Sequence, residues 1–242
     1  IKEIIAVSAA KLCGVTISGN SDNSFLLFTA AAEASGFNAA SSNASEHHVY
    51  LPHITGTGGF WRDYLQVDNN EDSVQSFTIT LYDHGAQVFQ QTFSVTALGH
   101  SIIDLKTLVP AIQSGTGIAS YTSDSLYFRL SYEEKAGGGV AEFRLTDQLK
   151  PDLGFYFSDV TPEVAWKAIA IANMNTSAAD VRLYAIGTNG VLDCAEINIA
   201  PFAKIVGLHT VWFPDIYFTE IEKIIAISTQ PLCGVTIAGN AG

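Results

Sequence analysis

Short runs in which apolar and polar residues alternate recur along the chain, and they predict β-strands. Residues 77–82 read FTITLY, a two-residue period typical of a strand with one buried face. Similar runs are separated by turn sequences such as DHGA at 83–86, which favours hairpins. No segment keeps an apolar period of 3.6 residues, so we expect little helix.

The predicted strands fall into groups separated by two linkers. Residues 35–46 (SGFNAASSNASE) are small, polar and aperiodic, and 146–154 (TDQLKPDLG) contain a proline between polar residues, as is typical of connecting segments. We expect residues 24–29 to be the return strand of a hairpin with 12–18. The strands are predicted at 4–8, 12–18, 24–29, 49–54, 61–67, 77–82, 88–95, 126–131, 140–145 and 155–160, with a further apolar segment at 102–109.

The two ends of the chain carry the same sequence. Residues 1–22 and 221–242 are identical at 13 of 22 positions when shifted by 220, which predicts a tandem repeat of that period. A weaker inner match aligns Trp166 with Trp61, Leu183 and Tyr184 with Leu81 and Tyr82, Gly187 with Gly85, and 205–208 with 102–105. Each period should therefore contain two related domains of about 105 residues.

These patterns predict an all-β fold of two antiparallel immunoglobulin-like β-sandwich domains in tandem. Residues 1–34 are expected to be tail strands of a preceding domain or a donor segment, and 35–46 a linker. Residues 47–149 form domain 1, and residues 150–242 form domain 2, which lacks its final strand. An N-terminal strand segment would thus be equivalent to the C-terminal end.

Three stretches of domain 1 carry a resemblance to a known type of module. They are YLPH at 50–53, GTGGFW at 56–61 and LQVDNN at 65–70. The arrangement resembles the tandem immunoglobulin-like repeat modules of bacterial secreted and surface proteins. The likeness extends less well to domain 2, where 158–166 lacks the glycine-rich loop and the proline. It implies a structural role and no catalytic residues.

A sandwich that lacks a strand has unpaired backbone groups that another strand can pair. We predict completion of domain 2 by a strand like 24–29, either from the next repeat of a longer polypeptide or from a separate subunit. The second copy of 1–22 favours the longer polypeptide, because donation alone would not require it. The predicted assembly strands contain Ile4, Ile5, Leu12, Val15, Ile17, Phe25, Leu26, Leu27 and Phe28 on one side, and Ile224, Ile225, Leu232, Val235 and Ile237 on the other.

Composition narrows the classes of partner. The net charge is −12, and the 12 Lys and Arg residues are scattered, which argues against nucleic acid. Apolar residues make up 48% of the chain, yet no apolar run approaches the ~18 residues of a membrane span. An acidic chain rich in small polar residues is typical of extracellular or cell-surface proteins, whose partners would be copies of itself or surface glycans.

The cysteines offer a possible covalent link. Cys13 and Cys233 occupy the same repeat position, so one period contains Cys194 and Cys233. An even pair per repeat predicts a Cys194–Cys233 disulfide, with the partner of Cys13 in a neighbouring repeat. The alternative is that these are buried free thiols.

The remaining motifs give little indication of a catalytic or metal-binding site. Asp68, Asn70 and Asp72 have the opening rhythm of a calcium loop but lack its later glycine and glutamate, so a plain turn is favoured. No nucleophile elbow, zinc-protease or phosphate-loop motif occurs, and neither an enzyme nor a cofactor is predicted.

We therefore expect a non-enzymatic extracellular structural repeat protein of a fibre, filament, stalk or adhesin. The alternative is a carbohydrate- or receptor-binding module. In that case Trp61, Trp166, Tyr50 and Tyr64 would provide aromatic faces for a sugar, although the repeat-equivalent tryptophans also suit a core role.

Overall fold

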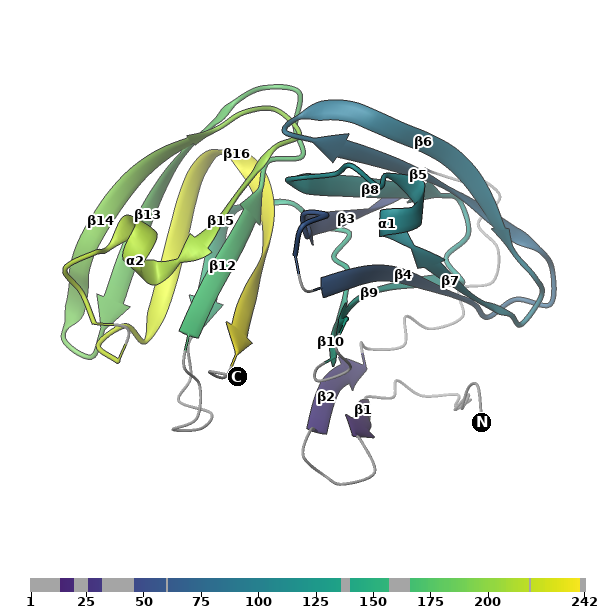
Figure 1. The fold of residues 1–242 in the computed structure, drawn as a ribbon, viewed down its shortest axis with the longest axis horizontal. Helices are drawn as coiled ribbons and strands as arrows, with labels where there is room; N and C mark the ends of the chain where they lie inside the picture. The colour runs from purple at the N-terminus through teal and green to yellow at the C-terminus, as the bar shows by residue number, and fades with distance from the viewer. Residues whose placement is uncertain are drawn as a thin grey trace.

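The computed structural model describes residues 14–19, 26–31, 46–59, 61–135, 140–156, 166–217 and 219–239. Within these ranges the chain consists of antiparallel strands and two single helical turns, α1 (Leu105–Leu108) and α2 (His209–Trp212). The prediction of an all-β antiparallel fold is confirmed. The strands form two groups of sheets side by side, with a hairpin beneath them (Figure 1).

The first group, here unit 1 (residues 46–145), contains two four-stranded sheets. Their orders are β3-β8-β5-β6 and β10-β9-β4-β7. The strands are β3 (His47–Ile54), β4 (Trp61–Asn69), β5 (Gln75–Asp83), β6 (Ala86–Val95), β7 (His100–Asp104), β8 (Gly115–Tyr121), β9 (Leu126–Glu134) and β10 (Val140–Arg144).

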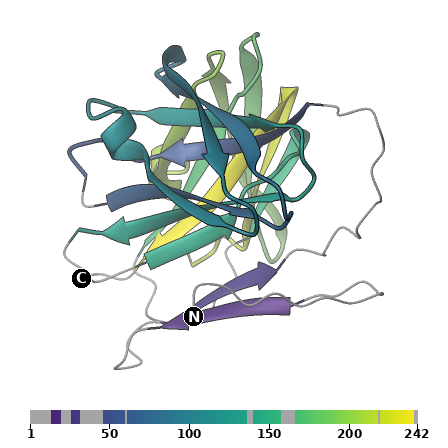
Figure 2. The same cartoon turned by 90° about the vertical axis from the view of Figure 1, so that its right-hand side faces the viewer.

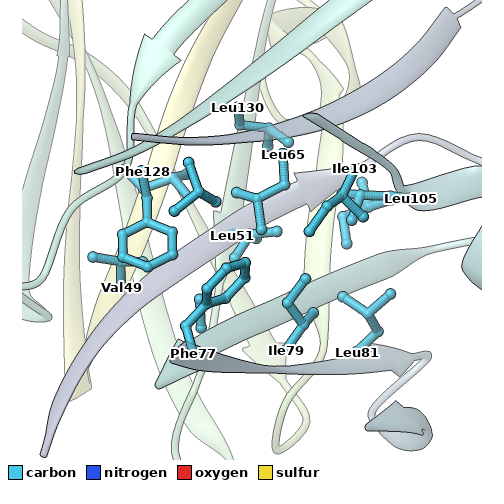
Figure 3. Close-up of a cluster of buried hydrophobic side chains, with 14 of the residues drawn as sticks. Val49, Leu51, Leu65, Phe77, Ile79, Leu81, Ile103, Leu105, Phe128 and Leu130 are labelled. Carbon is cyan, nitrogen blue, oxygen red and sulfur yellow. The ribbon is translucent and has the colours of Figure 1, made fainter. Parts of the chain in front are cut away.

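The core of unit 1 lies between its two sheets (Figure 3). Phe77, Ile79 and Leu81 alternate along β5 and are buried, as the two-residue period predicts. They meet Leu65 from β4 and Leu130 from β9, both fully buried. The alternation of the sequence thus fixes which face of each strand is inside.

The second group, unit 2 (residues 150–239), repeats this arrangement with fewer strands. They are β11 (Lys150–Tyr156), β12 (Trp166–Ala172), β13 (Ala179–Gly187), β14 (Gly190–Ile199), β15 (Lys204–Leu208) and β16 (Lys223–Gly239). The long β16 belongs to both sheets. Its first half lies between β11 and β13, and its second half pairs with β12. It therefore corresponds to β8 and β9 of unit 1 joined into one strand.

The inner repeat is real but has a different spacing from the predicted one. Asn69 and Asn173, 104 residues apart, make the same contacts: each Nδ2 donates to three backbone carbonyls, 2.7–3.3 Å away for Asn69 and 2.8–3.2 Å for Asn173. The hairpins agree, because Asp83↔Ala86 corresponds to Gly187↔Gly190. The predicted alignment of Leu183 with Leu81 is thus two residues out, because the apolar alternation of a strand looks the same after a shift of two.

Three segments differ from the prediction. Strand β8 is absent from the prediction, because its sequence GTGIASY contains glycines that weaken the strand signal. Strand β11 occupies 150–156, where the sequence predicts a linker up to 154. The apolar segment 102–109 divides into the end of β7 and the helical turn α1, which Asp104 caps by accepting from the Lys106 N–H at 2.9 Å.

Ahead of unit 1, β1 (Gly14–Gly19) and β2 (Leu26–Ala31) form the predicted hairpin. It is a separate two-stranded sheet and lies below the two units, as both views show (Figures 1 and 2). The predicted strand at 4–8 lies outside the described residues.

Candidate assembly surface

The second half of β16 is an edge that pairs on one side only, as far as the structure is described. Residues Cys233–Gly239 pair with β12 in the register Ala172↔Cys233 to Trp166↔Gly239. The described residues place no strand on the other side of this half. The first half of β16, in contrast, is paired on both sides. On the side away from β12, the second half of β16 presents backbone N–H and C=O groups that can pair with another strand.

Unit 1 shows what covers the equivalent edge. Strand β9, which corresponds to the second half of β16, pairs with β4 on one side and β10 on the other. The register with β10 runs from Arg129↔Arg144 to Glu133↔Val140. The equivalent positions on β16, 106 residues later, are 235–239. Among the described strands of unit 2, the counterpart of β10 is thus the one not found.

The N-terminal hairpin reproduces this pairing. Strand β1 reads GVTISG, and 234–239 read GVTIAG. Its register with β2 runs from Val15↔Ala30 to Gly19↔Leu26. Shifted by 220, this places β2 on the same five positions of β16, 235–239. Both hairpins also leave six residues between their last paired positions, 20–25 and 134–139. Strand β2 therefore has the register and connection of the missing strand.

The predicted assembly residues take different places. Ile224 and Leu232 are buried in the core of unit 2, whereas Ile225 and Val235 are half-buried. On β16, Ile237 pairs with Ala168. Val15, Ile17, Leu26, Leu27 and Phe28 lie on β1 and β2, and Ile4, Ile5, Leu12 and Phe25 lie outside the described residues.

The predicted Cys194–Cys233 disulfide within one chain is wrong. Both are free thiols; Cys194 is exposed on β14, and Cys233 is 1% exposed beside Ala172 in the other sheet. Cys194 lies across β13 from Ile225, and eight further residues of β16 cover about 26 Å of chain path. A disulfide needs Cα atoms within about 7 Å. Burial raises the pKa of the Cys233 thiol to about 12. Cys13 lies outside the described residues.

The acidic turn at 68–72 does not gather its carboxylates around one point. Asp68 is paired with Arg129 at 2.7 Å and with His100 at 2.6 Å. The described residues contain no group of three or more His, Cys, Asp or Glu side chains positioned to hold a metal ion. Asn69, within this turn, donates its side-chain amide to the carbonyls of Ser73, Val95 and Thr96 and so holds the turn in place.

The aromatic residues proposed as a sugar platform do not share one described cluster. Trp61 packs against the core of unit 1, and Tyr50 contributes to an apolar cluster between the units that also contains Met174 and Cys233. Tyr64 is half-buried, and the side chain of Trp166 lies outside the description. Trp61 and Tyr50 thus contribute to internal packing.

Sequence reasoning missed the contact between the two units. Phe202, in the loop before β15, stacks on Tyr82 of unit 1 with ring centroids 4.5 Å apart and 6° between planes. The Thr116 hydroxyl donates to the carbonyl of Phe202 at 2.7 Å. Gly85 lies so close that an added Cβ would meet the Pro201 carbonyl oxygen at 2.5 Å. Tyr82 and Phe202 are 120 positions apart, and no sequence pattern relates them.

A buried lysine joins the units a second time. The Lys204 ammonium donates to the carbonyls of Ile54 and Gly115, 2.7 and 2.8 Å away, and lies 2.8 Å from His53 Nδ1. Burial lowers the pKa of Lys204 to about 7. Burial first, and then the positive charge of Lys204, lower the pKa of His53 to about 3. His53 is therefore neutral, and its Nδ1 accepts a hydrogen bond from Lys204. This hydrogen bond requires that the two units lie close together.

A buried ion pair lies within unit 1. Asp63 is fully buried and lies 3.2 Å from the ammonium of Lys106. Burial raises the pKa of its carboxyl, partly offset by Lys106 and Thr55. Its hydrogen bonds to Thr55 and Lys106 satisfy the carboxylate and fix the loop after β3.

No family model matches the sequence, and no curated protein matches it significantly. In the described part of the chain, no helix has the length and apolar character to cross a membrane.

Proposed function

We propose that this chain is a non-enzymatic structural module, built from two immunoglobulin-like sandwiches in tandem, that forms head-to-tail arrays by β-strand completion. The β2 strand of one copy would pair with residues 235–239 of β16 in the preceding copy. The array would belong to an extracellular fibre, stalk or adhesin. The contact is the same whether the copies are consecutive repeats of one polypeptide or separate chains.

One observation carries this proposal: β2 has the register on β1 that β10 has on β9. Because β1 and 234–239 differ only at Ser18 and Ala238, a strand that pairs with β1 also fits β16. Joining two different surfaces of successive copies is a heterologous contact, which extends into an open array.

The energetics favour β16 over β1 as the partner of β2. An isolated two-stranded hairpin is at best marginal in water, whereas β16 already belongs to a sheet that covers a core. Strand β2 reads LLFTAA, so either face of it carries at least one large apolar side chain. Burial of each such side chain stabilises by about 1.5–3 kcal/mol.

The test measures assembly and edge protection together, using the whole chain. We expect amide hydrogen exchange at 235–239 to slow as protein concentration rises, in parallel with a growing mass in light scattering. Phe28→Pro removes an N–H of β2 and should abolish both effects. Ser41→Pro, in the linker, is the matched control and should leave both intact. Exchange at 235–239 that is independent of concentration would refute strand completion.

A further inference from the structure

The loop that brings Phe202 to the junction has a counterpart in unit 1. Both loops, 96–99 and 200–203, pass through the left-handed backbone region, with φ of 47° at Leu98 and 54° at Phe202. A backbone hydrogen bond joins the last residue of each to the first, at 3.0 and 3.2 Å. The two loops therefore present the residue at their third position in the same way.

Among the described residues, only one of these two side chains packs against the other unit. Phe202 stacks on Tyr82, whereas Leu98 is 55% exposed. Strand β6 begins at the hairpin that touches unit 2 and extends for ten residues, about 33 Å. The Leu98 loop therefore lies at the end of unit 1 away from the junction (Figure 1). A large apolar residue held there in a backbone conformation that costs about 1 kcal/mol or more indicates a contact surface.

Unit 2 carries the counterpart of the surface that receives Phe202. In unit 1 this surface is the outer face of β5 and β8, which includes Tyr82, Thr116 and Ile118. The register of β13 with β16 matches that of β5 with β8. The equivalent outward positions of unit 2 are Ile186, Lys223 and Ile225.

We call these three residues, with Tyr184 and Ile227, the socket face. They alternate with buried residues along β13 and β16, so they point away from the core. All except Ile227 are half-buried, and Ile227 is 51% exposed. Within the described residues, no further unit covers this face as unit 2 covers its counterpart on unit 1.

The apolar residues differ between the two junctions, and the loop residue and the sheet residue differ in the same sense. Within the chain, an aromatic ring on the loop (Phe202) meets an aromatic ring on the sheet (Tyr82). In the second set both positions are aliphatic, with Leu98 on the loop and Ile186 on the sheet. A leucine on an isoleucine gains dispersion contacts, as one ring does on another, so each junction has a matched apolar pair.

The charges on the loop side and on the socket side also differ between the two junctions, and they differ in a complementary way. The turn beside the Phe202 loop is neutral (172–177, ANMNTS), and its socket has Thr116. The turn beside the Leu98 loop is acidic (68–73, DNNEDS), and its socket has Lys223. The Leu98 N–H donates to the Glu71 carbonyl at 2.7 Å, so the acidic turn is held next to the loop. Opposite charges would thus face each other in the second junction.

We propose that the Leu98 loop of one copy docks on the socket face of the preceding copy, repeating between copies the junction seen within the chain. This proposal rests on the proposed function for the direction of the array: the copy that donates β2 to β16 also supplies Leu98 to the same unit 2. The buried lysine is not repeated, because His100 stands at the position of Lys204 and pairs with Asp68. The docking between copies is therefore weaker than the junction within one.

Cysteine cross-linking of the full chain tests the contact directly. In a Cys13→Ser, Cys194→Ser background, Leu98→Cys with Ile186→Cys should give a ladder of linked chains with a short bismaleimide reagent. Leu98→Cys with Val211→Cys is the control, because Val211 is 64% exposed on α2 and outside the socket face. We expect at least ten-fold less linkage there. Equal linkage in the two pairs would overturn the docking.

Two further variants separate docking from failure of the reagent or the fold. Tyr82→Cys with Phe202→Cys should link within one chain and not between chains. In the cross-linking background, Lys223→Glu should reduce the ladder several-fold, and Asp72→Lys added to it should restore linkage. Loss without restoration would contradict the charge pairing.

The outcome distinguishes this inference from the proposed function. Concentration-dependent protection at 235–239 without a ladder would leave strand completion standing and reject the docking. A ladder without that protection would support the docking and reject strand completion. If neither appears, both are wrong.

Discussion

Replacement of Phe202 by alanine is expected to weaken the junction between the two units. Truncation of a completely buried Phe to alanine costs about 3–5 kcal/mol. The loss of an aromatic pair adds about 0.5–1.5 kcal/mol to this cost. Phe202 is only half-buried, so we expect a loss of about 2 kcal/mol. Alanine keeps the left-handed backbone at this position (φ 54°), so the loss reports the side chain alone.

The assay is urea unfolding followed by tryptophan fluorescence and by circular dichroism. The wild-type units should unfold together, and Phe202→Ala should separate the transitions of the two units because it removes part of their coupling. Leu98→Ala, at the equivalent loop position, is the control. At concentrations where the chain is monomeric, it should change the free energy of unfolding by less than about 0.5 kcal/mol. Equal effects of the two substitutions would refute the assignment of coupling to the Phe202–Tyr82 stack.

Three other predictions concern the same framework. Asn173→Asp keeps the size of the side chain but removes the amide that donates to three carbonyls, and should cost about 2–3 kcal/mol in urea unfolding. His53 and Lys204 have pKa values lowered from 6.5 to about 3 and from 10.5 to about 7. The unfolded chain binds more protons in each window, so stability should rise with pH from 3 to 6.5 and again from 7 to 10.5; Lys204→Met should flatten the upper rise in an unfolding series over pH. Gly85→Ala would place a Cβ 2.5 Å from the Pro201 carbonyl oxygen at a φ of 85° and should increase protease cleavage between the units, whereas unchanged cleavage would show that the hairpin yields without opening the junction.

The sequence identifies the class of fold and the relation between the chain ends. Alternation of side chains along 77–82 indicates which residues are buried, because a strand places successive side chains on opposite faces. Repetition of 1–22 at 221–242 indicates that β1 and the end of β16 are the same element. The turn residues between 12–18 and 24–29 predict the hairpin that β1 and β2 form.

The alignment of the inner repeat, the junction and the cysteines could not be obtained in this way. An alternating pattern is unchanged by a shift of two residues, so the spacing of 104 was fixed only by the folded structure, through the contacts of Asn69 and Asn173 and the matching hairpins. Spacing in sequence likewise says nothing about the distance between Cys194 and Cys233, which the folding of β16 across both sheets decides.

The sequence by itself therefore determined the all-β class of the fold, most of the strands of unit 1 with their buried faces, and the equivalence of the two chain ends. These properties follow from local periodicity and from identity between residues, and both are visible along the chain. Only the tertiary structure decided that Phe202 packs on Tyr82 while Leu98, within the part of the chain that the structure describes, packs on no second unit. That difference depends on which surfaces the fold brings together, and residues 120 positions apart carry no mark of it in their sequence.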